Sequence, residues 1–103
     1  MSILFRRDVI AVINRDFLQQ HYLFKTVEVA IQDIEGEERA PFVQKEIKRI
    51  GVCPDQTHLR IYFEHQNFFA IPLNAEVIIE SDNWTATDRL GNLKYIIRRV
   101  RVS

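Results

Sequence analysis

The sequence predicts an α+β domain. An N-terminal amphipathic helix would pack on a curled antiparallel β-meander or small β-barrel of about five to six strands. Apolar residues recur at helical spacing in residues 8–24, whereas they alternate with polar residues in residues 25–34 and 58–64. Turn-forming residues separate the remaining β-prone runs at intervals of about 8–12 residues, which is typical of consecutive hairpins.

Residues 8–24 are expected to form the helix. One face of this helix is apolar, through Val9, Val12, Ile13 and Phe17. Asp8 can cap its start by accepting a backbone N–H. A strand at residues 8–14 is the alternative, because residues 9–13 are rich in β-branched side chains. The polar, unbranched stretch at residues 16–21 favours the helix.

The middle of the chain changes to the period of strands. Residues 25–34 alternate between apolar and polar side chains, as a half-buried strand does. An exposed acidic turn at residues 35–38 follows, in which Gly36 permits a positive φ. Residues 41–53 fit either a helix that ends at Gly51 or an irregular, bulged strand. We favour the strand because hairpins follow it.

Further hairpins are expected up to the C-terminal residues. Strands are expected at residues 58–64, 68–73 and 76–80, with turns at residues 54–57, 65–67 and 81–83. Pro72 indicates that the second of these strands lies at a sheet edge. Residues 84–99 form the last predicted hairpin, with its turn at residues 88–92. A terminal helix is the alternative, and Gly91 inside it would cost about 1 kcal/mol.

Composition and charge limit the class of protein. With 103 residues the chain is expected to form one domain, residues 1–103. The 14 Lys and Arg balance 14 Asp and Glu, which excludes a histone-like basic protein. The single cysteine, Cys53, cannot form an intramolecular disulfide. No apolar run approaches the roughly 20 residues that span a bilayer, so we expect a cytoplasmic protein without membrane contact.

No template for catalysis, metal binding or cofactor binding stands out. Cys53 and His58 flank one predicted turn and form the nucleophile–base pair that the sequence offers. The simpler interpretation is a small buried residue and a half-exposed strand histidine. His58 and His65 lie at the two ends of one strand, roughly 20 Å apart, so they cannot share a metal ion. We therefore expect no enzyme, no metal, no cofactor and no small-molecule substrate.

The remaining signals concern surfaces. The C-terminal residues are basic, whereas residues 28–38 are acidic. Phe68 and Phe69 must point to opposite sides of a strand, so one of them is exposed unless something covers it. These signals predict a small non-enzymatic protein-interaction module that self-associates as a homodimer or homo-oligomer, or binds a protein partner, and could serve regulation.

The alternative is a single-stranded nucleic-acid-binding small β-barrel, in which a basic, aromatic strand face stacks on bases and pairs with phosphates. The candidate interaction surface comprises Phe68, Phe69, Arg60, Tyr62, Tyr95, Arg98, Arg99 and Arg101. In a terminal strand, Arg99 and Arg101 would share a face with Tyr95, and Arg60 and Tyr62 could join them from a neighbouring strand. The simpler interpretation is that the terminal arginines protect an edge strand from pairing.

Overall fold

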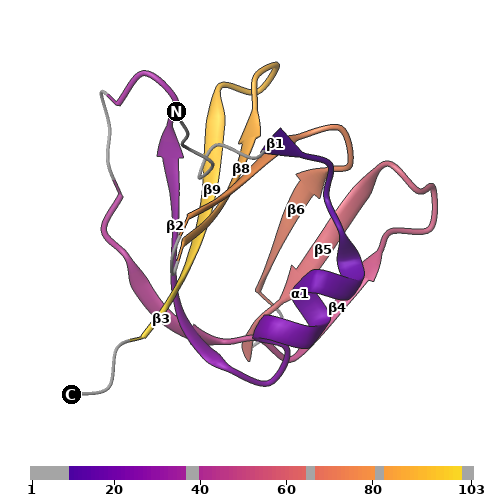
Figure 1. Ribbon diagram of the computed structural model, residues 1–103, viewed down its shortest axis with the longest axis vertical. Helices are drawn as coiled ribbons and strands as arrows, with labels where there is room; N and C mark the ends of the chain where they lie inside the picture. Colours follow the sequence, from indigo (N-terminus) through magenta and orange to yellow (C-terminus); the bar gives the residue numbers. More distant parts are fainter. Residues whose placement is uncertain (1–9, 37–39, 65–66, 81–82, 101–103) are drawn as a thin grey trace, which may run out of the picture.

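The computed structural model describes residues 10–36, 40–64, 67–80 and 83–100. These residues form one short helix and nine strands, which are arranged in two antiparallel sheets (Figure 1). The expected antiparallel, strand-rich architecture with one helix is confirmed, but the expected N-terminal position of the helix is not. The strands of the described ranges do not close into a barrel, and they number nine where about five to six were expected. One predicted strand is divided, and a short strand precedes the helix.

The chain order of the elements produces a meander that crosses between the sheets. The elements are β1 (Ile10–Ala11), α1 (Arg15–Tyr22), β2 (Thr26–Asp33), β3 (Val43–Glu46), β4 (Arg49–Val52), β5 (His58–Tyr62), β6 (Phe68–Pro72), β7 (Glu76–Glu80), β8 (Asn83–Asp88) and β9 (Leu93–Arg99). The larger sheet has the order β1-β7-β8-β9-β2-β3, and the smaller sheet has the order β4-β5-β6. The last hairpin, β8–β9, confirms the predicted hairpin over the terminal helix.

The helix is shorter than expected and begins later. A helix over residues 8–24 was expected, but α1 covers Arg15–Tyr22 and the strand β1 precedes it. The alternative strand is therefore correct for Ile10–Ala11, which pairs with β7. Asp8 lies outside the described residues, and Asn14 is the N-cap, because its Oδ1 accepts the N–H of Phe17 at 3.1 Å. A β-branched run that lies beside an available sheet edge is stabilised more by strand pairing than by extending the helix.

The helix packs against the smaller sheet. Its buried residues are Leu18 and Tyr22, and the helix contacts β4. The Nε2 atom of Gln19 donates to the carbonyl oxygen of Ile50 in that strand at 3.4 Å. The helix ends at Tyr22 because Leu23 is extended and Phe24 has a φ of 64°. No helix in the described ranges is long and apolar enough to cross a membrane.

A corner at Ile47 joins the two sheets. The expected irregular strand at residues 41–53 is confirmed, but it is divided into β3 and β4. Ile47 is fully buried, its N–H donates to the Lys25 carbonyl at 3.0 Å, and its own carbonyl accepts from Phe24 N–H at 2.8 Å. The next residue, Lys48, donates its N–H to the carbonyl of Tyr62 at 2.8 Å. The chain therefore stops pairing beside β2 and begins to pair with β5 within two residues.

A tight turn forms the second connection between the sheets. Ala75 N–H donates to the carbonyl of Pro72 at 3.0 Å, and Leu73 N–H donates to the carbonyl of Thr57 at 3.0 Å. Strand β6 contacts β8 without pairing with β7. Pro72 thus ends β6 at the edge of the smaller sheet, as expected, because proline lacks the N–H that a further strand would need.

The inner faces of the two sheets enclose one apolar core. Its fully buried members include Trp84, Leu18, Ile47, Leu59, Ile61, Ile71, Ile97, Val27 and Val77. Among the aromatic residues, Phe63 and Trp84 are buried in this core, and the partly buried Phe17 packs against it. The alternation expected in residues 58–64 is confirmed, since Leu59 and Ile61 are fully buried.

Candidate interaction face

The outer face of the smaller sheet carries a cluster of arginine and aromatic side chains. Because Leu59 and Ile61 point into the core, their neighbours in β5, Arg60 and Tyr62, point outward. The strand register places Arg49 and Phe68 on either side of Tyr62, and Gly51 and Ala70 on either side of Arg60. We call the four large residues, Arg49, Arg60, Tyr62 and Phe68, the guanidinium–aromatic face.

Each arginine of this face lies against an aromatic ring. The Cζ atom of Arg49 is 4.2 Å from the ring centroid of Tyr62, and the Cζ atom of Arg60 is 5.3 Å from that of Phe68. The two rings are 5.3 Å apart, and Nη1 of Arg60 donates to the Tyr62 hydroxyl at 3.2 Å. Cation–π contacts at exposed sites contribute about 0.5–1 kcal/mol each, so they hold the guanidiniums in place.

The arginines of the face are not paired with carboxylates in the part of the chain that the structure describes. Neither Arg49 nor Arg60 forms an ion pair there. The hydrogen bond from Arg60 lowers the pKa of Tyr62, and the charges of both arginines add to this effect. The same hydrogen bond raises the pKa of Arg60. Phe68 is 45% exposed, so the face offers positive charge and apolar ring surface together.

The space above the middle of this face is open. A Cβ atom added to Gly51 would meet no atom within 4 Å outside its own chain neighbours. Ala70, on the other side of Arg60, is also small. The two small residues leave a shallow area between the larger side chains, where another molecule can approach the sheet closely.

The expected split of the Phe68/Phe69 pair is confirmed. Phe68 is on the outer face, whereas Phe69 points inward. The Phe69 ring packs edge-on against Phe63, with centroids 5.0 Å apart, and against Tyr95, with centroids 5.5 Å apart. Tyr95 is only 8% exposed, and burial raises the pKa of its hydroxyl. The expectation that Tyr95 lies on an exposed basic face is therefore wrong, because its side of β9 faces the core.

The described basic residues near the C-terminus, Arg98 and Arg99, do not join the guanidinium–aromatic face. We expected the strand of residues 93–102 to lie beside β5. Strand β9 lies instead between β8 and β2 in the larger sheet. Arg98 donates from Nε to Glu28 Oε1 at 2.8 Å, and its Cζ is 3.7 Å from the ring centroid of Phe42. The Nη2 atom of Arg99 lies 3.4 Å from Nδ1 of His21. Arg101 lies outside the described residues.

Cys53 and His58 are brought together in the turn between β4 and β5. The Sγ atom of Cys53 is 2.7 Å from Oδ1 of Asp55 and accepts the backbone N–H of His58 at 3.3 Å. The His58 imidazole instead contacts the Thr57 hydroxyl through Nδ1 at 2.8 Å. That hydroxyl lies 3.6 Å from the thiol. The four side chains thus form a polar network that fixes the turn.

This network changes the acidity of its members. The hydrogen bond to Asp55 raises the pKa of Cys53, but the hydrogen bonds from Thr57 and from the backbone of His58 outweigh it, so the pKa is lowered overall. The hydrogen bond from Cys53 lowers the pKa of Asp55, and those from Thr57 lower it further. Both side chains therefore lose their protons more readily in the folded protein than in the unfolded chain.

Metal binding was not expected from the histidine spacing. His65 lies outside the described residues. In the described part of the chain, no group of three or more His, Cys, Asp or Glu side chains could hold a metal ion.

Sequence reasoning missed Arg49, which belongs to the span where helix and strand were hard to distinguish. The signal that could have found it is register: once residues 49–52 pair with residues 59–62, Arg49 lies opposite Tyr62. Comparisons of this chain with protein-family models, with curated proteins and with solved structures found no match.

Proposed function

We propose that the protein is a non-enzymatic interaction module whose guanidinium–aromatic face binds an acidic segment of a partner protein. One observation carries the proposal: two guanidiniums lie against two rings of one sheet face, the half-buried Tyr62 and the exposed Phe68, and neither guanidinium has a carboxylate partner among the described residues. Arginine, tyrosine and phenylalanine are enriched in the cores of protein interfaces.

The geometry suits carboxylate recognition. A guanidinium that already rests on a ring has lost much of its side-chain freedom, so less entropy is lost when a partner binds. Its planar donors can hold a carboxylate with two parallel hydrogen bonds. The rings of Tyr62 and Phe68 add apolar surface next to these charges. The open space above Gly51 lets the partner reach both arginines at once.

The same face is a poor surface for two-fold self-association. A second copy that docked through this face would bring four guanidiniums together, which costs energy through like-charge repulsion. Head-to-tail association would use the acidic residues 28–38, but Glu28 is already paired with Arg98. We therefore favour a different, acidic protein as the partner. Light scattering over a range of protein concentrations tests self-association, and a dimer that persists in Arg49→Glu protein would assign it to another surface.

Single-stranded nucleic acid is the second candidate ligand, because base stacking uses the same arrangement of rings and guanidiniums. Stacking of a base on an aromatic side chain contributes about 1–3 kcal/mol. Each neutralised phosphate contributes about −0.7 to the slope of log K against log salt concentration, so two arginines predict a slope of about −1.4. This candidate ranks second because Tyr95, Arg98 and Arg99 lie elsewhere.

The test is an NMR amide-shift titration with two probes, an acetylated peptide of alternating Glu and Phe, and decathymidylate. The peptide is expected to shift amides of β4, β5 and β6. The double variant Arg49→Gln/Arg60→Gln should bind the peptide at least about 10-fold more weakly, which corresponds to about 1.4 kcal/mol. The control Arg15→Gln/Lys94→Gln makes the same change in net charge away from the face and should bind normally.

Two results would change the conclusion. If both double variants weaken binding equally, the attraction is non-specific charge and the proposal is wrong. If decathymidylate shifts the same amides with a salt slope near −1.4 while the peptide does not bind, the second candidate replaces the first.

A further inference from the structure

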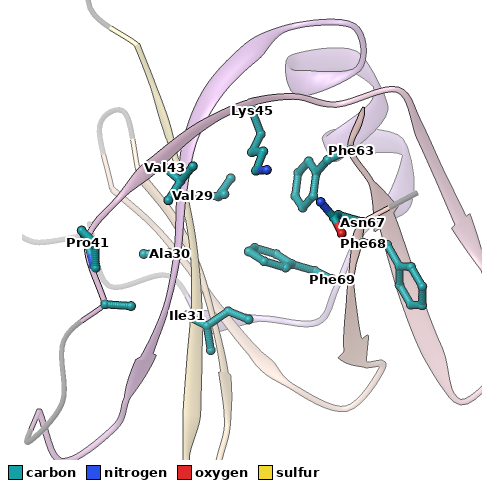
Figure 2. Close-up of a pocket in the computed structure, with 11 residues that line it drawn as sticks. Val29, Ala30, Ile31, Pro41, Val43, Lys45, Phe63, Asn67, Phe68 and Phe69 are labelled. Carbon is teal, nitrogen blue, oxygen red and sulfur yellow. The ribbon is translucent and has the colours of Figure 1, made fainter. Parts of the chain in front are cut away.

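A hollow separate from the two arginines lies between the sheets. Figure 2 shows this hollow between strands β2 and β3 on one side and Phe63, Asn67 and Phe69 on the other. Its volume is about 300 Å³. Val29 and Val43 line it from the larger sheet, and Phe63 and Phe69 line it from the smaller one.

The walls of this hollow are formed before any ligand binds. Phe69 is fixed by edge-on contacts with Phe63 and Tyr95. Val29 is 4% exposed and Phe63 is 5% exposed, so both are held by the core. Val43, by contrast, is 47% exposed at the opening. The hollow therefore has a rigid apolar floor and an entrance that solvent reaches.

One cationic group projects into this apolar space. Lys45 lies on the same side of β3 as Val43, because alternate residues of a strand share a face. Figure 2 shows its ammonium between Val29 and Phe63. In the described part of the chain no carboxylate forms an ion pair with Lys45. An ammonium next to apolar walls is partly desolvated, so an anion that hydrogen-bonds to it is favourable.

We propose that this hollow binds a small apolar carboxylate, whose carboxylate contacts Lys45 Nζ and whose apolar part lies against Phe63 and Phe69. The volume sets the size of the ligand. A cavity of about 150 Å³ holds one benzene molecule, so twice that volume fits an apolar part of up to about 12 carbon atoms. Ligand sites commonly combine an apolar lining with one such polar group. This site goes beyond the proposed function: Phe68 borders both the hollow and the guanidinium–aromatic face, but neither Arg49 nor Arg60 lines the hollow.

The test compares octanoate with 1-heptanol, which has the same seven-carbon alkyl chain without the charge. Binding is followed by isothermal titration calorimetry and by amide shifts of Val29, Val43 and Phe69. The wild-type protein is expected to bind octanoate more tightly than heptanol. Lys45→Met should weaken octanoate binding at least 10-fold and leave heptanol binding unchanged. Lys94→Met, on a different strand and outside the hollow, is the matched control and should change neither.

A second variant tests the location independently of charge. Ile31 is 37% exposed at the edge of the hollow, so Ile31→Trp should fold and obstruct both ligands. The proposal is overturned if octanoate shifts none of the three amides, or if Lys45→Met and Lys94→Met bind octanoate alike. Arg49→Gln/Arg60→Gln should retain octanoate binding, so failure of this site and failure of the proposed interaction face are distinguishable.

Discussion

Replacing Ile47 with alanine tests the corner that joins the two sheets. Ile47 is fully buried, and the substitution removes three side-chain carbon atoms. At about 0.8 kcal/mol for each buried CH₂ group, the lost transfer free energy is about 2.4 kcal/mol. The unfilled cavity adds to this loss, which gives a decrease of about 3–4 kcal/mol in the free energy of unfolding.

The assay is thermal and urea unfolding of the wild-type and variant proteins. For a domain of this size, each 1 kcal/mol shifts the melting temperature by about 4–8 °C, so the variant should melt at least about 12 °C lower. Since the change acts on packing in the native state, the urea m-value should stay the same.

Ile31→Ala is the matched control for this prediction. It removes the same atoms from a residue that is 37% exposed, so we expect a smaller loss, about 1–2 kcal/mol. Equal losses in the two variants would refute the reasoning, because they would show that Ile47 does not pack more tightly than a half-exposed strand residue.

Two further predictions concern local hydrogen bonds. Asn14→Ala removes the side-chain acceptor of Phe17 N–H and should decrease the free energy of unfolding by about 1 kcal/mol; an unchanged urea midpoint would contradict Asn14 as the cap. The pKa of Asp55 is lowered below its ordinary value of 3.8 by hydrogen bonds from Cys53 and then Thr57. Its contribution to stability is therefore present above pH 3.8 and is lost as the pH falls through the lower, folded-state value. Asp55→Asn protein should lose less stability than wild type when urea unfolding is compared above and below that pH, and identical pH profiles would show that the network does not stabilise the turn.

Strands with strict alternation could be predicted because the pattern itself records which side faces the core. In residues 58–64 the apolar positions Leu59 and Ile61 are the buried ones, and the bounds of β5 differ from the prediction by two residues. The turn chemistry was equally informative. Gly36, expected to allow a positive φ, has a φ of 75°, because glycine lacks the Cβ atom that makes this region costly.

The helix start was predicted wrongly because local pattern cannot reveal an unpaired sheet edge. Residues 9–13 contain both a helical stripe and a β-branched run. The available edge of β7, more than 60 residues away in the sequence, selected the strand for Ile10–Ala11. Helix and strand propensities differ by about 1 kcal/mol or less for most residues, so a few tertiary hydrogen bonds are enough to decide between them.

The candidate site also combines residues that the sequence indicated with a residue that only the structure placed. Sequence alone indicated Arg60 and Tyr62 as outward-facing residues, since they alternate with Leu59 and Ile61, and it indicated that one of Phe68 and Phe69 is exposed. It grouped them with Tyr95 and the C-terminal arginines because both segments are basic and aromatic. The structure separates the two groups, since β5 and β9 belong to different sheets, and it adds Arg49 through the register of β4.

The sequence by itself determined the succession of short strands, the position of most turns and the inward or outward direction of residues in the strictly alternating strands. These properties depend on the two-residue period and on turn chemistry, which act between neighbours in the chain. Only the tertiary structure decided that the chain turns a corner at Ile47. That corner places Arg49 beside Tyr62, buries Tyr95 and opens the hollow next to Lys45. The pairing of strands is a contact between segments far apart in the chain, and its register follows from packing the whole core at once.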